Sequence, residues 1–134
     1  MKVTMNIDNK KLFNLLCSAI YDEWNFRIAT SSWTSINEFW YSDANEENRK
    51  SNPRPCIEDK IWTYVMASNA HIIKFVDKED GSESFMTWTR IENGTNTMAE
   101  KYERHFMDVI MENDDAVTAD VWFQCVLLDE VVYG

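Results

Sequence analysis

The spacing of apolar residues at the start of the chain predicts a strand followed by a helix. Residues 2–7 alternate between polar and apolar side chains, which is the period of a half-buried strand. Asp8 follows, and an aspartate just before an apolar stripe is suited to cap a helix. The apolar stripe of this helix consists of Leu12, Leu15, Leu16, Ala19, Ile20 and Trp24. Residues 25–30 then fit a second, short strand.

An aromatic segment and a polar segment come next. Ser31 or Ser32 is suited to cap a second helix, although Trp, Ile and Phe side chains also favour strands. The apolar stripe of this segment consists of Trp33, Ile36, Phe39 and Trp40. Residues 42–55 (SDANEENRKSNPRP) are polar and contain both prolines of the chain. This composition predicts an exposed loop.

The centre of the chain predicts a short helix and a β-hairpin. Apolar residues keep helical spacing from Ile57 onward, and the helix is expected to end at Ser68 or Asn69. Residues 71–77 and 83–91 are rich in β-forming side chains. The segment between them contains an Asp-Gly pair, which is a strong signal for a hairpin turn.

The last part of the chain predicts two further helices. The pair Asn93-Gly94 indicates a turn, after which an amphipathic helix is expected to end near Asn113. Its apolar stripe consists of Met98, Tyr102, Phe106, Val109 and Ile110. The run DVWFQCVLL fits a buried helix or a buried strand, and periodicity does not distinguish them. We favour a helix capped by Thr118 and then a short strand over residues 131–133.

These elements predict an α+β fold. The expected architecture is a single small domain over residues 1–134, in which an antiparallel sheet that contains the β-hairpin is packed by about five helices. The length of 134 residues and the hydrophobic content of 45% are sufficient for one packed core. No apolar run is long enough to span a bilayer, and the start of the sequence does not resemble a signal peptide. We therefore expect a cytoplasmic protein of the host cell, without membrane contact.

The sequence contains no recognisable catalytic, nucleotide-binding or metal-binding motif. Its three cysteines have no C-x-x-C spacing, and its three glycines do not form a phosphate-binding loop. We expect hydrogen-bonded surface or boundary positions, and not metal ligands, for His71 and His105. The interpretation at this point is a non-enzymatic protein without cofactor or metal.

Negative charge accumulates in the C-terminal third. The formal net charge of the chain is −10, and no Lys or Arg follows Arg104. An acidic surface attracts basic groups on a partner and disfavours direct binding of nucleic acid. The candidate partner-binding residues are Asp108, Glu112, Asp114, Asp115 and Asp120. The alternative interpretation is that these charges only keep the protein soluble.

A second candidate site combines aromatic rings with nearby cations. Rings beside cations can stack on a base and hold a phosphate. The candidate ligand-binding residues are Trp33, Trp40, Tyr41, Arg49 and Arg54. Core packing is the alternative for these rings, and we expect Trp40 and Tyr41 to be the exposed ones.

The C-terminal sequence MAEKYERHFMDVIMENDDAVTADVWFQCVLLDEVVYG resembles the C-terminal signature of small uncharacterised proteins of phages and other mobile elements. The shared pattern is M-A-x-K-Y, H-F, E-N-D-D-A, T-A-D-V and E-V-V-Y-G. The segment TSSWTSINEFWYSD resembles an aromatic segment of the same proteins that is usually richer in glycine. The resemblance implies a setting among the accessory genes of mobile elements.

Charge and setting together suggest two functions. The first is a binding protein that inhibits a host defence factor, of the anti-CRISPR type, by contact with its basic, nucleic-acid-binding surface. The alternative is a binder that sequesters a nucleotide signal in an aromatic pocket. The oligomeric state does not follow from the sequence.

Overall fold

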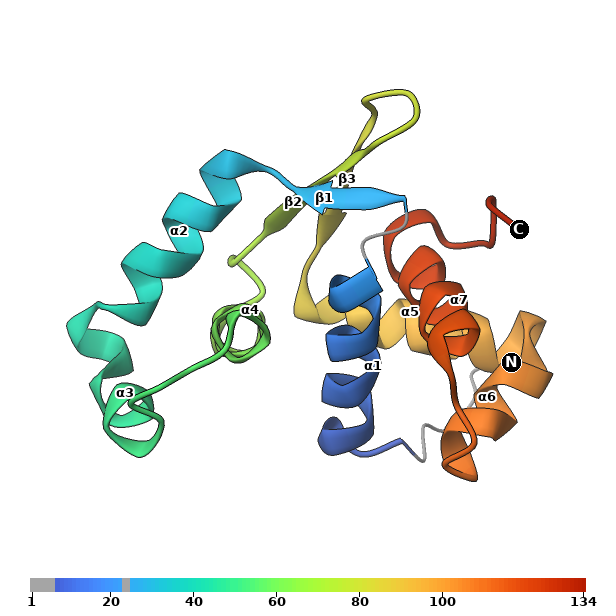
Figure 1. The fold of residues 1–134 in the computed structure, drawn as a ribbon, viewed down its shortest axis with the longest axis horizontal. Coiled ribbons are helices and arrows are strands. Elements are labelled where there is room, and N and C mark those ends of the chain that lie inside the picture. Colours follow the sequence, from blue (N-terminus) through green and yellow to red (C-terminus); the bar gives the residue numbers. More distant parts are fainter. Residues whose placement is uncertain (1–6, 23–24) are drawn as a thin grey trace. The chain divides into compact units, whose positions relative to one another are not determined.

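The computed structural model describes residues 7–22 and 25–134 and has an α+β architecture (Figure 1). Within these residues the chain forms seven α-helices, one short 3-10 helix and a three-stranded antiparallel sheet. The predicted fold class is therefore confirmed. Two compact units are distinguished, one formed by residues 1–24 and 89–134 and the other by residues 25–88. The single domain stays a prediction, and the strand expected over residues 2–7 lies outside the described residues except for Ile7.

The sheet belongs to the unit of residues 25–88. Strand β2 (Ile73–Asp77) lies between β1 (Phe26–Ile28) and β3 (Glu83–Met86), and both neighbours pair with it in antiparallel orientation. The predicted hairpin is thus confirmed as β2 and β3. In its turn Gly81 has φ +75°, a left-handed conformation that glycine adopts at little cost.

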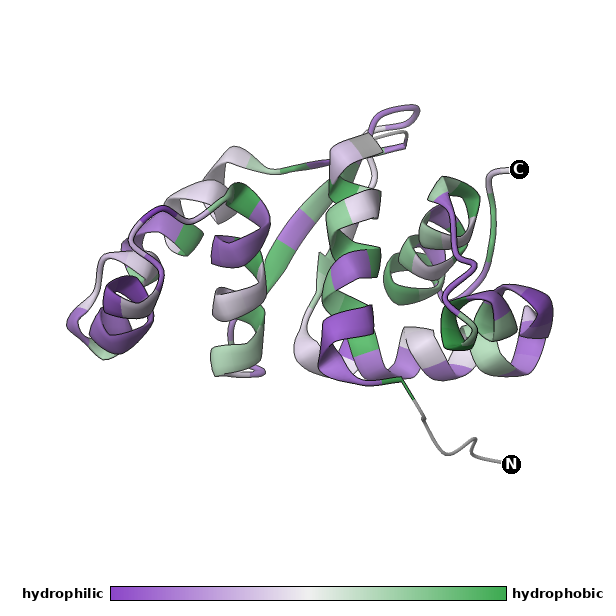
Figure 2. Ribbon diagram, turned by 60° about the horizontal axis from the view of Figure 1, so that its bottom comes forward, coloured by the Kyte–Doolittle hydropathy of each residue, from purple (hydrophilic) through white to green (hydrophobic). Residues whose placement is uncertain are grey.

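Alternation along the strands gives the sheet one buried face. The side chains of Phe26, Ile28, Ile73, Phe75 and Met86 are all buried. Residues between them, such as Lys74 and Phe85, are more exposed, because successive side chains point to opposite faces of a sheet. Figure 2 shows this alternation along β2 as a change from hydrophobic to hydrophilic colour and back.

Helices α2 (Thr30–Trp40) and α4 (Ile57–Ala67) pack against each other in this unit. Both were predicted, but the capping serine was not correct, because α2 begins after Ala29 without a side-chain cap. The hydroxyl of Ser32 instead accepts a hydrogen bond from the backbone N–H of Lys74 at 2.8 Å. This bond ties the start of α2 to strand β2.

The segment 42–55 is not the exposed loop that its composition predicted. It contains the 3-10 helix η1 (Asp43–Asn45) and helix α3 (Glu46–Ser51). The short α3 carries acidic residues in its first turn and basic residues in its last, and charges in this order interact favourably with the helix dipole. None of its residues is buried. Figure 2 accordingly shows α3 in hydrophilic colours. A helix exposed on all sides has no apolar stripe by which its sequence would reveal it.

The other unit is built from helices. It contains α1 (Asn9–Asp22), α6 (Glu103–Ile110), α7 (Ala116–Leu128) and α5 (Trp88–Lys101) from Thr89 onward. The first helix was predicted with its cap, and a carboxylate oxygen of Asp8 accepts the N–H of Lys11 at 2.9 Å. Helix α7 packs on α1 and α6 and is buried on nearly all sides, which explains why its sequence shows no period. The fully buried Trp122 donates from its indole nitrogen to the hydroxyl of Thr95 at 2.9 Å.

Three predicted features of residues 87–113 are wrong. Residues 88–91 are helical and not part of a strand, because Ile91, Thr95 and Met98 share one buried side of α5. The pair Asn93-Gly94 is not a turn but lies inside this helix. The long helix expected up to Asn113 is interrupted at Tyr102, which has φ −130° and ψ 51° and separates α5 from α6.

The C-terminal segment also differs from its prediction. Residues 131–133 form no strand. Their backbone N–H groups are bound by the side chains of Tyr102, between α5 and α6, and of Gln124 in α7, and not by a neighbouring strand. The predicted helix before them is confirmed as α7. Its cap is Asp115 and not Thr118.

Candidate protein-binding site

The five predicted partner-binding carboxylates lie on α6, on α7 and on the turn between them. Asp108 is in α6, Glu112 and Asp114 are in the turn, Asp115 caps α7 and Asp120 is in its second turn. The turn is built by backbone hydrogen bonds, among them one of 2.7 Å from the N–H of Asn113 to the carbonyl of Asp108. Glu112 adopts the left-handed conformation at φ 59°. Helix α6 ends in this turn, and the turn exposes Glu112 and Asp114 on the surface.

Two of these carboxylates support the fold. One oxygen of Asp115 accepts hydrogen bonds from the N–H of Thr118 at 2.9 Å and from its hydroxyl at 3.2 Å. These bonds, led by that of the N–H, lower the pKa of Asp115. Asp120 accepts a bond of 2.8 Å from the side-chain amide of Gln124. Both residues therefore have a structural role, whatever else they contact.

The other three carboxylates form what we call the acidic turn: Asp108, Glu112 and Asp114. None of them takes part in the three ion pairs found among the described residues. Glu112 and Asp114 are exposed, and Asp108 is partly exposed. The ammonium of Lys11 donates to the backbone carbonyl of Ile110 at 3.3 Å and so binds the end of α6.

Two methionines add apolar surface beside the acidic turn. Met107 is 44% exposed and Met111, the C-cap residue that ends α6, is 64% exposed, and they stand four positions apart in the sequence. Side chains at this spacing are neighbours on a helix surface. Neither methionine was predicted as a binding residue. The helical spacing of the sequence could have indicated their exposure, because both lie outside the buried stripe that contains Phe106 and Val109.

Of the two aromatic residues that were expected to be exposed, only one is exposed. Tyr41 is exposed as predicted, at 66%, but Trp40 is buried at 3%. The guanidinium of Arg49 donates to the carbonyl oxygens of Trp40 and Ser42, so it binds the backbone at the end of α2. A pocket that needs the face of Trp40 and a free Arg49 is therefore not supported.

The remaining members of that set lie at different places. Trp33 is partly exposed on α2, and Arg54 is exposed in the segment between α3 and α4. The cation near Tyr41 is Lys60, whose ammonium lies 5.3 Å from the ring centroid and also donates to the side-chain oxygen of Asn37 at 3.1 Å. This contact between a lysine and an aromatic ring had not been predicted.

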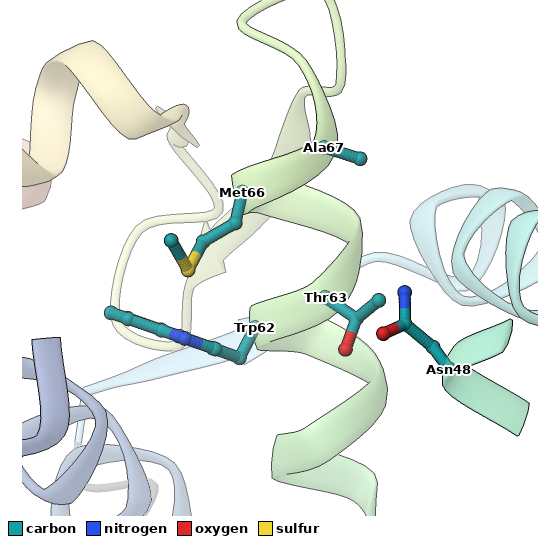
Figure 3. Close-up of a pocket in the computed structure, with 5 residues that line it drawn as sticks. All are labelled: Asn48, Trp62, Thr63, Met66 and Ala67. Carbon is teal, nitrogen blue, oxygen red and sulfur yellow. The ribbon is translucent and has the colours of Figure 1, made fainter. Parts of the chain in front are cut away.

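A shallow hollow of about 350 Å³ lies on α3 and α4, lined by Asn48, Trp62, Thr63, Met66 and Ala67. Figure 3 shows Trp62 and Met66 directed to one side of α4, whereas Thr63 faces Asn48 on another side. The polar and aromatic groups thus do not converge on one point. Trp62 also contacts Trp88 edge to face, with ring centroids 5.6 Å apart.

Metal-ligating side chains and the two histidines are the remaining candidates for a functional site. Within the part of the chain that the structure describes, no three His, Cys, Asp or Glu side chains are grouped so that they could hold a metal ion. Both histidines are partly exposed and hydrogen bonded, as predicted: Nδ1 of His71 lies 2.7 Å from the carbonyl of Tyr64, and Nδ1 of His105 lies 3.2 Å from the hydroxyl of Thr118. Over residues 7–22 and 25–134, no helix is both long and apolar enough to cross a membrane.

Comparison of the chain with models of protein families, with curated proteins and with solved structures gives no match. The candidate site is therefore judged on its own geometry and charge.

Proposed function

We propose that this chain is a non-enzymatic binding protein of a phage or mobile element that inhibits a host defence factor by contact. The partner is a protein with a basic surface that normally holds nucleic acid. The observation that carries the proposal is the acidic turn, whose three carboxylates have no cation partner among the described residues. Exposed carboxylates of this kind are available to basic groups of another protein.

The charge of the surrounding sequence supports the same partner class. No Lys or Arg follows Arg104, whereas seven acidic residues do. Such a one-sided charge steers a basic partner toward this end of the chain and repels nucleic acid. It also competes with the phosphates that the partner would otherwise bind.

The two exposed methionines supply an apolar contact at the same place. Interfaces combine an apolar centre with a polar rim, and methionine is enriched in such centres because its flexible side chain adapts to a partner. Met107 and Met111 would form the centre of this interface, with the acidic turn as its rim. The resemblance of the sequence from Met98 onward to proteins of mobile elements supports the setting.

The experiment is affinity capture from a nuclease-treated bacterial lysate with the tagged chain, followed by mass spectrometry. We expect a nucleic-acid-binding protein to be retained and to be eluted by a DNA duplex or by added salt. The test variant is D108N/E112Q/D114N, which leaves the structural residues Asp115 and Asp120 intact. Retention by this variant should fall by about tenfold or more, since each lost charge contact weakens the complex.

A matched control removes the same number of charges elsewhere. The variant E38Q/E92Q/E100Q neutralises three exposed glutamates on α2 and α5 and has the same net charge as the test variant. It should retain the partner like the unchanged chain. Equal losses in both variants would mean that only net charge matters, and no loss in either would refute the acidic turn as the binding site.

A further inference from the structure

The buried side chain of Gln124 binds the backbone of the C-terminal tail, residues 131–134. Its oxygen accepts the N–H groups of Val132 at 2.8 Å and of Tyr133 at 2.9 Å. Its amide nitrogen donates to the carbonyl of Tyr133 at 3.0 Å as well as to Asp120. One glutamine thus recognises three backbone groups of two successive residues.

Tyr102 extends this recognition by one residue. Its hydroxyl accepts the N–H of Val131 at 2.9 Å, so three consecutive N–H groups of the tail are bound by side chains. Tyr102 is the residue at which the helix is interrupted between α5 and α6. The interruption and the polar position in α7 therefore both contribute to one site for peptide backbone.

The polarity of Gln124 needs an explanation, because its neighbours Phe123, Cys125, Val126 and Leu127 form an apolar core. Gln124 is 0% exposed, and a buried amide is costly unless its donors and acceptors are bonded. A leucine would fill a core position without this requirement. Apart from Asp120, the partners that satisfy the amide all belong to the tail.

Part of the tail is exposed to solvent. Val132 is 55% exposed, and Gly134 is exposed as well, whereas Val131 and Tyr133 are partly buried. The tail leaves α7 through Asp129, which has the left-handed conformation at φ 66°, uncommon for a residue other than glycine. The exposed part of the tail that follows this turn is where local opening of the chain costs the least free energy.

We propose that Gln124 and Tyr102 form a binding site for a short peptide backbone, with residues 131–133 as its intramolecular ligand. The tail leaves reversibly, and a peptide segment of another chain takes its place. The ligand class is a non-helical peptide with two successive N–H groups followed by a carbonyl. Because the contacts are to backbone, the site tolerates varied side chains except proline at the positions of Val131, Val132 and Tyr133.

The test uses variants of the 134-residue chain and a fluorescein-labelled peptide with the sequence of residues 128–134. The variant V132P removes one bonded N–H from the tail and leaves Gln124 and Tyr102 unchanged. The labelled peptide should bind V132P at least about tenfold more tightly than the unchanged chain, where the tail competes at high effective concentration. The control V132A keeps the N–H and should behave like the unchanged chain. Binding is read by fluorescence anisotropy.

The double variant Q124L/V132P should lose the binding that V132P gains. If V132P does not bind the peptide, or if binding persists without Gln124, the proposal is overturned. Hydrogen exchange on the unchanged chain gives an independent reading. The amides of residues 132 and 133 should exchange faster than those of α7 around Gln124, and equal rates would overturn the release of the tail.

Discussion

Gly94 of α5 lies directly against the backbone of Val126 of α7. A Cβ atom added at Gly94 would be 2.4 Å from the α-carbon of Val126 and 2.6 Å from its nitrogen. Backbone atoms of a packed helix cannot move aside as a flexible side chain can. The absence of a side chain at residue 94 therefore sets how closely the two helices approach.

The variant G94A should destabilise the protein. Alanine favours a helix by about 1 kcal/mol over glycine, but forced separation of two packed helices costs typically about 1–3 kcal/mol or more. We expect a net loss because the contact involves backbone, and urea unfolding measures it. The control N93A changes an exposed neighbour in the same helix and should be neutral or slightly stabilising. A G94A protein as stable as the unchanged chain would refute the close approach.

The hydrogen bond between Trp122 and Thr95 makes a second prediction. Thr95 is fully buried, and replacing it by valine leaves the indole N–H of Trp122 without its acceptor. An unsatisfied buried donor costs about 1–3 kcal/mol of unfolding free energy. The variant T95S keeps the hydroxyl and should lose less than T95V. The reverse order in thermal or urea unfolding would contradict the bond.

The cap of α7 should give the protein a pH-dependent stability. The pKa of Asp115 is lower in the folded chain than its ordinary value of 3.8, first because of the N–H of Thr118. The charged carboxylate of Asp115 therefore adds to the free energy of unfolding above pH 3.8, and this addition disappears as the pH falls through the lower, folded-state pKa. D115A should lose stability at neutral pH and approach the unchanged chain in acid. An equal difference at both pH values would contradict a role of the charged cap.

The thiols should differ in reactivity. Burial raises the pKa of Cys125 to about 12, so its thiolate is scarce at neutral pH as well as enclosed. Cys56 is exposed, although burial of its sulfur and its hydrogen bond to Asp59 raise its pKa too. A thiol reagent should therefore label Cys56 before Cys125, and C56S should remove the earlier phase. Rapid labelling of Cys125 in the folded chain would contradict this order and show that helix α7 opens readily.

Sequence periodicity predicted the elements that have one buried side. Helix α1 shows a regular apolar stripe, and the hairpin has alternating strands around an Asp-Gly turn, so local pattern and tertiary packing agree. Helix α3 was missed because it buries no residue and has no stripe. The pair Asn93-Gly94 misled the prediction, because its glycine serves helix packing and not a turn.

The exposure of the candidate residues could be predicted only where their charge was informative. The acidic residues are polar and follow one another closely, so their surface position follows from the sequence. Asp115 and Asp120 differ from the residues of the acidic turn because they have structural hydrogen bonds, which a sequence does not reveal. The burial of Trp40 and the role of Gln124 likewise depend on which elements meet in space.

The positions of the tryptophans give each unit its own optical signal. Trp122 is enclosed in the unit of residues 1–24 and 89–134, whereas Trp62 and Trp88 contact each other in the unit of residues 25–88. A variant that keeps Trp122 as its only tryptophan reports the first unit through its emission, and a variant that keeps only Trp62 and Trp88 reports the second. If both signals are lost at one denaturant concentration, the chain unfolds as one cooperative domain. Two separate midpoints would make it two folding units joined within helix α5.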